Sequence, residues 1–376
     1  MVEIKDSKIW LSSPHMGGEE LKFVKQAFKE NWIAPLGPNV NGFESDLASY
    51  LQQSTHVAAL SSGTAALHLG LKLVGVNRGD TVLCQSFTFA ASANPIAYIG
   101  AEPAFIDSEK ETWNICPEQL ERGIKSLLDK GIKPKAIIAV HLYGMPYKIA
   151  EVHKIAQTYD IPVVEDSAEA LGSFYHGVHC GTFGEVAALS FNGNKIITTS
   201  GGGALVSKSA AVKQRAIFLA SQARDEAPHY QHSEIGYNYR MSNITAGIGR
   251  GQIMVLDERV KARRKNYAFY ADQLSNISDI TFLEEPKDVF SNRWLSCILT
   301  DSYERREEIR KKLETYNIES RPLWKPMHLQ PVFKDCPTFN NGVSEDLFDR
   351  GLCLPSGSNL KQEELEKVVG IIKNIG

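Results

Sequence analysis

The stretch Val186–Val206, VAALSFNGNKIITTSGGGALV, holds a single lysine between two apolar runs. The first run is apolar throughout instead of alternating, which is typical of a strand that helices cover on both faces. Three consecutive glycines, Gly201–Gly203, precede the second run, and a solvated surface lysine needs no such setting. The stretch therefore raises two linked questions: which fold buries these strands, and what Lys195 faces.

Apolar runs of this kind recur along the first 250 residues and alternate with amphipathic helical patterns. The predicted strands are His56–Leu60, Thr81–Gln85, Glu102–Ile106, Ala136–His141, Pro162–Glu165, Val186–Phe191 and Gly203–Val206. The predicted helices are Gly17–Glu30, Asn41–Leu51, Ser62–Leu73, Ser92–Ile99, Pro117–Lys130 and Ile149–Tyr159. This regular alternation predicts an α/β fold, a three-layer αβα sandwich around a mostly parallel sheet.

The pattern changes after about residue 250. A long charged helix is predicted over Val255–Leu274, followed by a strand at Asn292–Leu299 and helices at Tyr303–Tyr316 and Lys361–Ile375. Elements of both kinds at this lower density indicate a smaller α+β domain. We therefore expect a large domain, residues 1–250, and a small C-terminal domain, residues 251–376.

Bulk composition narrows the functional classes. The 376 residues include 41 Lys and Arg against 44 Asp and Glu, without the basic stripe of a nucleic-acid-binding protein. The start, MVEIKDSKIW, lacks the apolar core of a signal peptide, and no apolar run reaches the ~18 residues of a membrane helix. Six scattered cysteines without a CxxC pattern are typical of reduced thiols. We expect a cytoplasmic protein without a nucleic-acid or membrane partner.

Four features follow the ends of predicted strands, where doubly wound sheets bind ligands. The turn at Gly63 and Thr64 opens a helix whose N–H groups favour an anion, although a plain serine cap also explains it. Phe89 could lie flat on a planar ring or fill the core. Asp166 ends a buried strand, where an acid without a partner is costly. Lys195 is the fourth feature.

One cofactor needs all four features. Pyridoxal phosphate carries a phosphate, a flat ring, a ring nitrogen that a carboxylate keeps protonated, and an aldehyde that condenses with a lysine amine. Asp166 would then pair with the ring nitrogen, and Lys195 would bind the aldehyde and move the substrate Cα proton. The residues alone thus indicate a pyridoxal phosphate enzyme, and a transaminase as the simplest case.

Four motifs in this order resemble the DegT/StrS sugar aminotransferases, which are fold-type I pyridoxal phosphate enzymes. They are SSGTAAL at Ser61–Leu67, EDSAEALG at Glu165–Gly172, SFNGNKIITT at Ser190–Thr199 and GYNYRMSN at Gly236–Asn243. The resemblance covers essentially the whole chain. It implies an enzyme that aminates ketosugars attached to nucleotides, with L-glutamate as the expected amino donor.

The resemblance also implies roles for individual residues. Lys195 would carry the cofactor, Asp166 would pair with its ring nitrogen, and Gly63, Thr64 and Ser190 would hold its phosphate.

Further roles implied by the resemblance concern the ring, the partner and the substrate. Phe89 occupies the position of the stacking aromatic, and Glu169 stands where many members place His or Gln against the cofactor. Asn238 would reach the phosphate of a partner subunit, which implies a homodimer with shared active sites. The residues expected to contact the sugar nucleotide are Arg321, Trp324 and His328. His328 could also be a structural loop histidine.

Two departures from the common family pattern concern the substrate. The glycine run is TSGGG at Thr199–Gly203, where much of the family has Gly-Glu-Gly-Gly, and Glu169 replaces His or Gln. With Asn-Gly-Asn before the lysine, they resemble the subgroup that aminates C4 of 4-keto-6-deoxy sugars. We expect a UDP-N-acetylbacillosamine-type product for surface glycan or polysaccharide biosynthesis or protein glycosylation, with a GDP-perosamine synthase as the alternative.

Other hypotheses fit the residues less well. A related C3 dehydratase would carry histidine in place of Lys195, and a catalytically silent ligand-binding relative would be expected to lose Lys195 or Asp166. A nicotinamide dehydrogenase needs a GxGxxG turn, which the chain lacks after its first strand. The stretch His176–Cys180, HGVHC, predicts a tight turn between short strands and no metal site, because no second ligand pair has zinc-like spacing.

Overall fold

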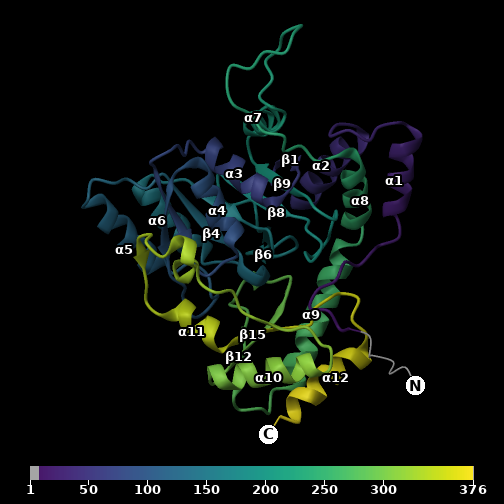
Figure 1. Cartoon of the computed structure of the whole chain (residues 1–376), viewed down its shortest axis with the longest axis vertical. Coiled ribbons are helices and arrows are strands. Elements are labelled where there is room, and N and C mark those ends of the chain that lie inside the picture. Colours follow the sequence, from purple (N-terminus) through teal and green to yellow (C-terminus); the bar gives the residue numbers. More distant parts are fainter. Residues whose placement is uncertain (1–7, 376) are drawn as a thin grey trace.

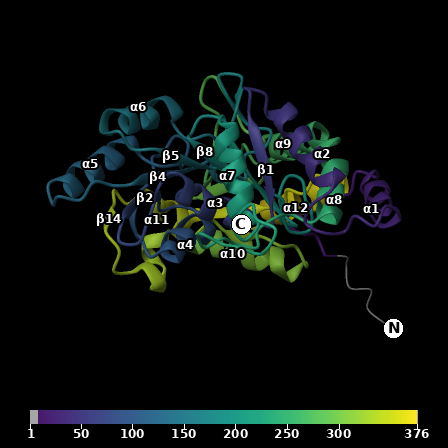
Figure 2. The same cartoon turned by 90° about the horizontal axis from the view of Figure 1, so that it is seen from above.

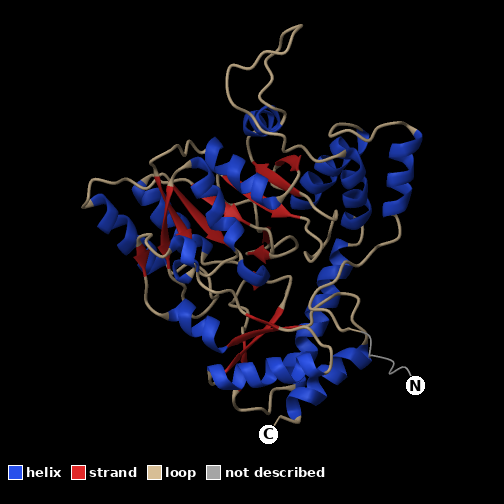
Figure 3. Ribbon diagram, in the orientation of Figure 1, coloured by secondary structure: helices blue, strands red, loops and turns tan. Residues whose placement is uncertain are grey.

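A computed structural model describes residues 8–375 of the chain. Its centre is an eight-stranded sheet with helices on both faces (Figures 1 and 3). In spatial order the strands are β1 (His56–Leu60), β9 (Gly203–Ser207), β8 (Val186–Ser190), β5 (Val163–Asp166), β4 (Ala136–Val140), β2 (Thr81–Gln85), β3 (Glu102–Ile106) and β14 (Thr338–Phe339). Only β9 runs antiparallel to its neighbours, so the predicted mostly parallel sandwich is confirmed.

Helices bury both faces of this sheet, which explains the continuous apolar runs. In β1, Ala58 and Leu60 belong to one core cluster, whereas Val57 and Ala59 belong to another. The first face is covered by α3 (Gly63–Leu73), α4 (Ala90–Ile99) and α7 (Ala210–Ala220). The second face is covered by α2 (Pro38–Leu51), α5 (Pro117–Leu128) and α6 (Ile149–Tyr159). Both faces of the sheet are thus covered by helices, and polar side chains gather at strand ends.

A second sheet, antiparallel and four-stranded, forms a smaller α+β unit at the bottom of Figure 1. Its strands, in order, are β10 (Ile280–Phe282), β12 (Ser296–Thr300), β15 (Gly351–Leu354) and β13 (Arg321–Pro322). The helices α10 (Tyr303–Thr315) and α12 (Gln362–Lys373) pack on it. The long helix α9 (Leu256–Gln273) reaches this unit, and its Tyr270 lies in the unit's core.

The two units exchange segments at both ends of the chain. Ile9 pairs with Ile318 and packs in the core of the small unit. In the other direction, β14 adds a strand to the edge of the large sheet. The predicted division near residue 250 stays a prediction, since these two segments cross it.

The remaining elements complete the surface. In Figure 2, α1 (Glu20–Lys29) and α8 (Asn243–Ile253) lie together at one side of the central sheet, and α11 (Val343–Arg350) lies at the other end. A small third sheet joins β11 (Val289–Phe290), β6 (Phe174–Tyr175) and β7 (Val178–His179).

The stretch His176–Cys180 forms the predicted tight turn. β6 and β7 pair directly, and the two residues between them have positive φ, 49° at His176 and 75° at Gly177. Within residues 8–375, no group of three or more His, Cys, Asp or Glu side chains is placed to hold a metal ion. In the same part of the chain, no helix combines the length and apolarity needed to cross a bilayer.

Candidate active site

A cavity of about 290 Å³ lies at the carboxyl edge of the central sheet, where this fold class binds ligands. Its walls come from the segments that follow β1, β2, β5 and β8, and from two tryptophans of the small unit, Trp294 and Trp324. It brings together most of the predicted site residues: Gly63, Thr64, Phe89, Asp166, Glu169, Ser190, Lys195 and Trp324. These residues are far apart in sequence, so the sheet edge is what makes them neighbours.

Lys195 sits in the turn between β8 and β9 with its side chain only 11% exposed. Its Nζ lies 3.4 Å from Glu169 Oε1 and 4.3 Å from the centre of the Trp294 ring. The other oxygen of Glu169 accepts a hydrogen bond of 2.7 Å from Tyr143 N. Burial raises the pKa of the Glu169 carboxyl, and the positive charge of Lys195 opposes that shift. The amine therefore faces an acid and an aromatic ring, and little water.

Asp166 ends β5 and is 6% exposed. Ser92 Oγ donates a hydrogen bond of 2.6 Å to Oδ2, and Ala168 N donates one of 3.1 Å to Oδ1. Thr88 in turn lies 2.7 Å from Ser92, hydroxyl to hydroxyl. Within residues 8–375, no cationic side chain pairs with Asp166. An acid held in this way at a cavity wall suits a protonated nitrogen of a ligand.

The preceding residue, Glu165, has a structural role. Its buried carboxylate accepts hydrogen bonds from His141 Nε2 at 2.8 Å and from the backbone N–H groups of Gly181, Phe183 and Gly184. Burial by itself would raise the pKa of Glu165, but the hydrogen bonds from His141 and the backbone lower it overall. Glu165 thus fixes the loop that leads into β8, and with it the spacing between Asp166 and the lysine turn.

The N-terminus of α3 forms another wall. Ser62 caps the helix through its side chain, which leaves the N–H groups of Gly63 and Thr64 at the free helix end. Residue 63 has to be small, because a Cβ there would lie 2.9 Å from Ser190 Cβ. Helix N–H groups beside a serine hydroxyl are typical of a phosphate-binding site.

Aromatic side chains form the outer wall of the cavity. Phe89 is exposed and lies 5.3 Å from Trp324, ring centre to ring centre. Tyr143 stacks between Trp324 and Trp294, with interplanar angles of 18° and 15°. Trp324 Nε1 is buried and has no hydrogen-bond partner within the described residues. A flat ring or a sugar fits such an aromatic wall.

Three predicted site residues do not line this cavity. Asn238 is exposed on the surface, and Arg321 is exposed and paired with a neighbouring glutamate at 2.6 Å. Both ring nitrogens of His328 have partners. Nδ1 lies 2.6 Å from Ser86 Oγ, and Nε2 lies 3.2 Å from a glutamate oxygen. Their expected contacts with cofactor or nucleotide stay predictions.

Two residues of the site were missed by the sequence analysis. Trp294 covers the lysine amine, and Ser92 orients Asp166. Trp294 falls within a predicted strand, and Ser92 begins a predicted helix, so neither carried a local sign of function. Both matter only because the fold brings distant segments together.

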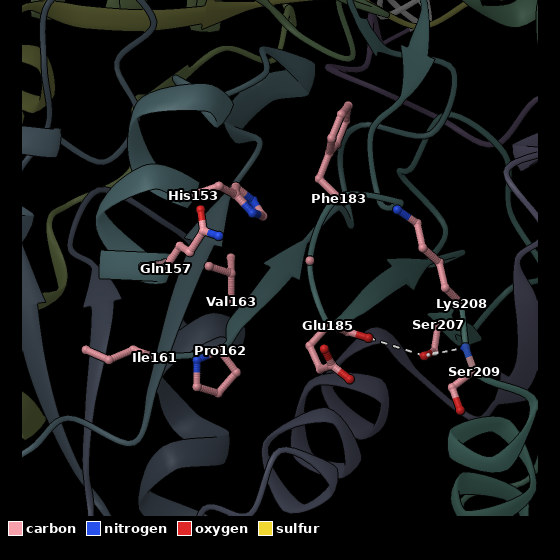
Figure 4. Close-up of a pocket in the computed structure, with 12 residues that line it drawn as sticks. His153, Gln157, Ile161, Pro162, Val163, Phe183, Glu185, Ser207, Lys208 and Ser209 are labelled. Carbon is pink, nitrogen blue, oxygen red and sulfur yellow. Dashed lines mark hydrogen bonds between the residues drawn. The ribbon is translucent and has the colours of Figure 1, made fainter. Parts of the chain in front are cut away.

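A larger and more open cavity, of about 450 Å³, lies at the opposite edge of the sheet (Figure 4). Its polar side chains include His153 and Gln157 of α6, Glu185 before β8, and Lys208 before α7. In Figure 4 these side chains spread around the rim and do not converge on one point. Convergence of a buried acid, a lysine and a helix N-terminus distinguishes the smaller cavity as the candidate site.

Comparison with known proteins identifies the family to which this site belongs. The model of the DegT/DnrJ/EryC1/StrS aminotransferase family matches residues 14–373. The chain belongs to this family. The resemblance seen in the sequence is therefore confirmed, and the protein is a sugar transaminase by family.

Individual relatives span the whole chain. EpsN of Bacillus subtilis (strain 168), named as a pyridoxal phosphate-dependent aminotransferase, is 50% identical over 372 residues, which cover 98% of this chain and 96% of EpsN. The GDP-perosamine synthase of Escherichia coli O157:H7 is 37% identical over 354 residues, 94% of each chain. The crystal structure of a DegT DnrJ EryC1 StrS aminotransferase from Brucella abortus has a TM-score of 0.88 at 30% identity, with 94% of both chains covered.

We predict that Gly203→Ala disturbs the helix N-terminus. A Cβ at residue 203 would lie 2.3 Å from the Ser62 carbonyl carbon and 2.4 Å from Gly63 N, and backbone atoms cannot rotate away. Unfolding free energy should fall by about 1–3 kcal/mol, the usual cost of overpacking, and pyridoxal phosphate should bind more weakly. Gly193→Ala is the matched control, because its Cβ would approach only Pro14 Cγ, at 4.0 Å, and Gly193 does not line the cavity. Equal unfolding midpoints and equal affinities for the two variants would contradict this description of the cavity.

Proposed function

We propose that this protein is a pyridoxal phosphate-dependent aminotransferase that moves an amino group from L-glutamate to C4 of a nucleotide-linked 4-keto-6-deoxy sugar. The observation that carries the proposal is the shielded amine of Lys195 in one cavity with Asp166 and the N-terminus of α3. Family membership and the names of the relatives support the same class of reaction.

The residues present fit the cofactor at each of its polar ends. Asp166, which lacks a cationic partner among the described residues, would hold the protonated ring nitrogen. Gly63, Thr64 and Ser190 would hold the phosphate, since a side chain at position 63 would fill that space. Phe89 would lie against the ring. When bound, pyridoxal phosphate supplies an electron sink and a carrier for the amino group.

The chain's own side chains would transfer the substrate proton and exclude water from the lysine amine. Lys195 would hold the cofactor covalently and carry the substrate proton on Nζ. Glu169 lies 3.4 Å from the same nitrogen, and the pKa of its carboxyl is raised by burial, so the two groups can share a proton. Trp294 covers the amine and limits access of water. One site would serve both the amino donor and the ketosugar, which implies ping-pong kinetics.

A homodimer with shared active sites is part of the proposal. Asn238 follows the loop that projects beyond α7 at the top of Figure 1. In this loop Tyr230 and Ile235 are 78% and 85% exposed. A partner subunit packed on this loop would cover both side chains. We therefore assign Asn238 to the phosphate site of a partner subunit, which its exposure allows.

The nucleotide carrier is the finer part of the proposal. The sequence features favour a UDP-linked N-acetyl sugar, which would give a product of the UDP-N-acetylbacillosamine type. A GDP-linked sugar is the second candidate, and the 37% identity to an E. coli GDP-perosamine synthase supports it. Both candidates place the new amine on C4 of a 4-keto-6-deoxy sugar, so the same active-site chemistry serves either one.

We predict that Lys195→Ala folds normally and loses turnover by at least about a hundredfold, the scale of a general acid–base contribution. Lys208→Ala, in the cavity of Figure 4, is the matched control and should keep its turnover. Circular dichroism and steady-state rates with L-glutamate and the ketosugar decide the point. Near-normal turnover of Lys195→Ala would refute the proposed role.

The carrier can be identified from the absorbance of the loaded enzyme. The visible band should bleach with L-glutamate and return when UDP-4-keto-6-deoxy-GlcNAc is added. Bleaching without return, followed by return with GDP-4-keto-6-deoxymannose, would select the GDP-linked sugar. If neither sugar restores the band, the assignment to 4-keto-6-deoxy sugars is wrong, although the transaminase assignment stands.

The shared site can be tested by subunit mixing. Lys195→Ala should be inactive, and Asn238→Ala should bind the cofactor weakly. A mixed dimer would contain one site with a native lysine and a native asparagine from different subunits, so mixing should restore turnover. Mixed samples that stay as inactive as the parents, after subunit exchange has been verified by mass, would contradict the shared site.

A further inference from the structure

Arg263 is a buried cation without an anionic partner. It lies on α9 with 1% of its surface exposed, and within residues 8–375 it forms no ion pair with a carboxylate. Its Nε also lacks a hydrogen-bond partner there. Burial, and then the nearby charge of Arg259, lower the pKa of the Arg263 guanidinium to about 9, which leaves it charged at neutral pH. Burying an unpaired charge costs several kcal/mol of folding free energy. A contribution to stability therefore does not explain why an arginine stands at this position.

The two terminal nitrogens of Arg263 bind segments that lead to the active-site lysine. Nη1 donates to the Trp294 carbonyl, and Nη2 donates to Ser12 Oγ at 2.9 Å. Ser12 Oγ donates in turn to the Asn194 carbonyl at 2.7 Å, and Trp294 Nε1 donates to the same carbonyl at 2.8 Å. The carbonyl just before Lys195 therefore has two donors, and Arg263 holds both residues that supply them.

Trp294 also contacts the lysine directly. Its ring centre lies 4.3 Å from Lys195 Nζ, and its other neighbour in the stack is Tyr143. Arg263 does not line the cavity, so it reaches the amine only through Trp294 and the Asn194 carbonyl. Fixing the Trp294 backbone sets the ring over the amine, and fixing Ser12 sets the turn that carries the amine.

We propose that Arg263 is a positioning residue for Lys195. Its guanidinium on α9 binds Ser12 of the N-terminal segment and Trp294 of the small unit, and both of these residues bind the carbonyl that precedes Lys195. The rigid arginine fork carries donors on separate nitrogens at the end of one long side chain, which fits its contacts with two acceptors on different segments. The proposal rests on the proposed function, because it assumes that the Lys195 amine is the reactive group.

Arg306 provides a matched control elsewhere in the fold. It is 2% exposed, lies on α10, and pairs with Glu307 at 3.4 Å from Nε. Two of its guanidinium nitrogens, Nε and Nη1, take no part in a hydrogen bond within the described residues. Its guanidinium packs against the rings of Tyr303 and Phe348, and it does not line the candidate site. Replacing either arginine by Met removes a buried charge, but only one of them is connected to Lys195.

The first test compares Arg263→Met with Arg306→Met in the cofactor-free protein. Lys195 is labelled with acetic anhydride, and its labelling rate is measured by mass spectrometry relative to an exposed lysine such as Lys25. Pyridoxal phosphate affinity is measured separately by absorbance. Replacing a buried arginine changes the unfolding temperature of both variants, but only Arg263→Met should change the Lys195 labelling rate and weaken cofactor binding. Each effect should be about tenfold, the lower end of the loss seen when an outer-shell partner of a metal ligand is removed.

The second test holds even if Arg263→Met does not fold. Ser12→Ala cuts the link between Arg263 and the Asn194 carbonyl at a partly exposed residue, and Ser13→Ala is its control, since Ser13 Oγ bonds Asn359. Ser12→Ala should change the Lys195 labelling rate and weaken cofactor binding, and Ser13→Ala should change neither. Unchanged Lys195 labelling in Ser12→Ala would overturn the proposal, and so would unchanged labelling in a folded Arg263→Met. If wild type failed to bind pyridoxal phosphate, the proposed function would fail, while the labelling comparison would still decide the role of Arg263.

Discussion

Burial of both faces of the central sheet is the constraint from which the site follows. A polar side chain within such a strand must find partners inside the protein, and a polar side chain at the strand end can face a ligand. Glu165 and Asp166 show the two outcomes at adjacent positions. Glu165 accepts hydrogen bonds from His141 and the backbone, whereas Asp166 accepts them from Ser92 and Ala168 N and lines a cavity. One strand thus supplies a structural acid and a site acid.

The candidate site depends on both units of the fold. The large sheet supplies the acid, the lysine and the helix N-terminus, but the lid over the lysine comes from Trp294 of the small unit. Arg263 on the connecting helix binds both sides of this junction. Movement between the two units would therefore alter the surroundings of the amine, and the buried guanidinium is placed to limit such movement.

The sequence was sufficient for the parts of the fold that have a strong local pattern. All seven predicted strands of the large sheet and their six helices exist, with ends shifted by a few residues. The helix α8 was not predicted, because Gly247, Gly249 and Gly251 weaken helix propensity and break the apolar pattern. The structure explains these glycines: a Cβ at Gly249 would lie 2.6 Å from the Phe43 ring, and one at Gly251 would lie 2.6 Å from Glu20 N. Close packing, which the sequence does not display, favours glycine there.

The residues of the site also fall into two groups, those that the sequence predicts and those that it does not. Lys195, Asp166 and the turn at Gly63 follow strand ends, so topology alone predicts that they meet. Trp294 and Arg263 act through tertiary contacts over long sequence separations, and no local pattern marks them. The role of His328 stays a prediction: the motif assigns it to the substrate, and in the structure its ring is hydrogen-bonded to Ser86.

The central claim is that Lys195 is the amine that holds pyridoxal phosphate. Sodium borohydride reduction of the protein loaded with pyridoxal phosphate, followed by peptide mapping, tests it most directly. The account predicts a stable pyridoxyl group on Lys195 and on no other residue at stoichiometric loading. A pyridoxyl group on a different lysine, or none after reduction of a protein shown to be folded, would contradict it.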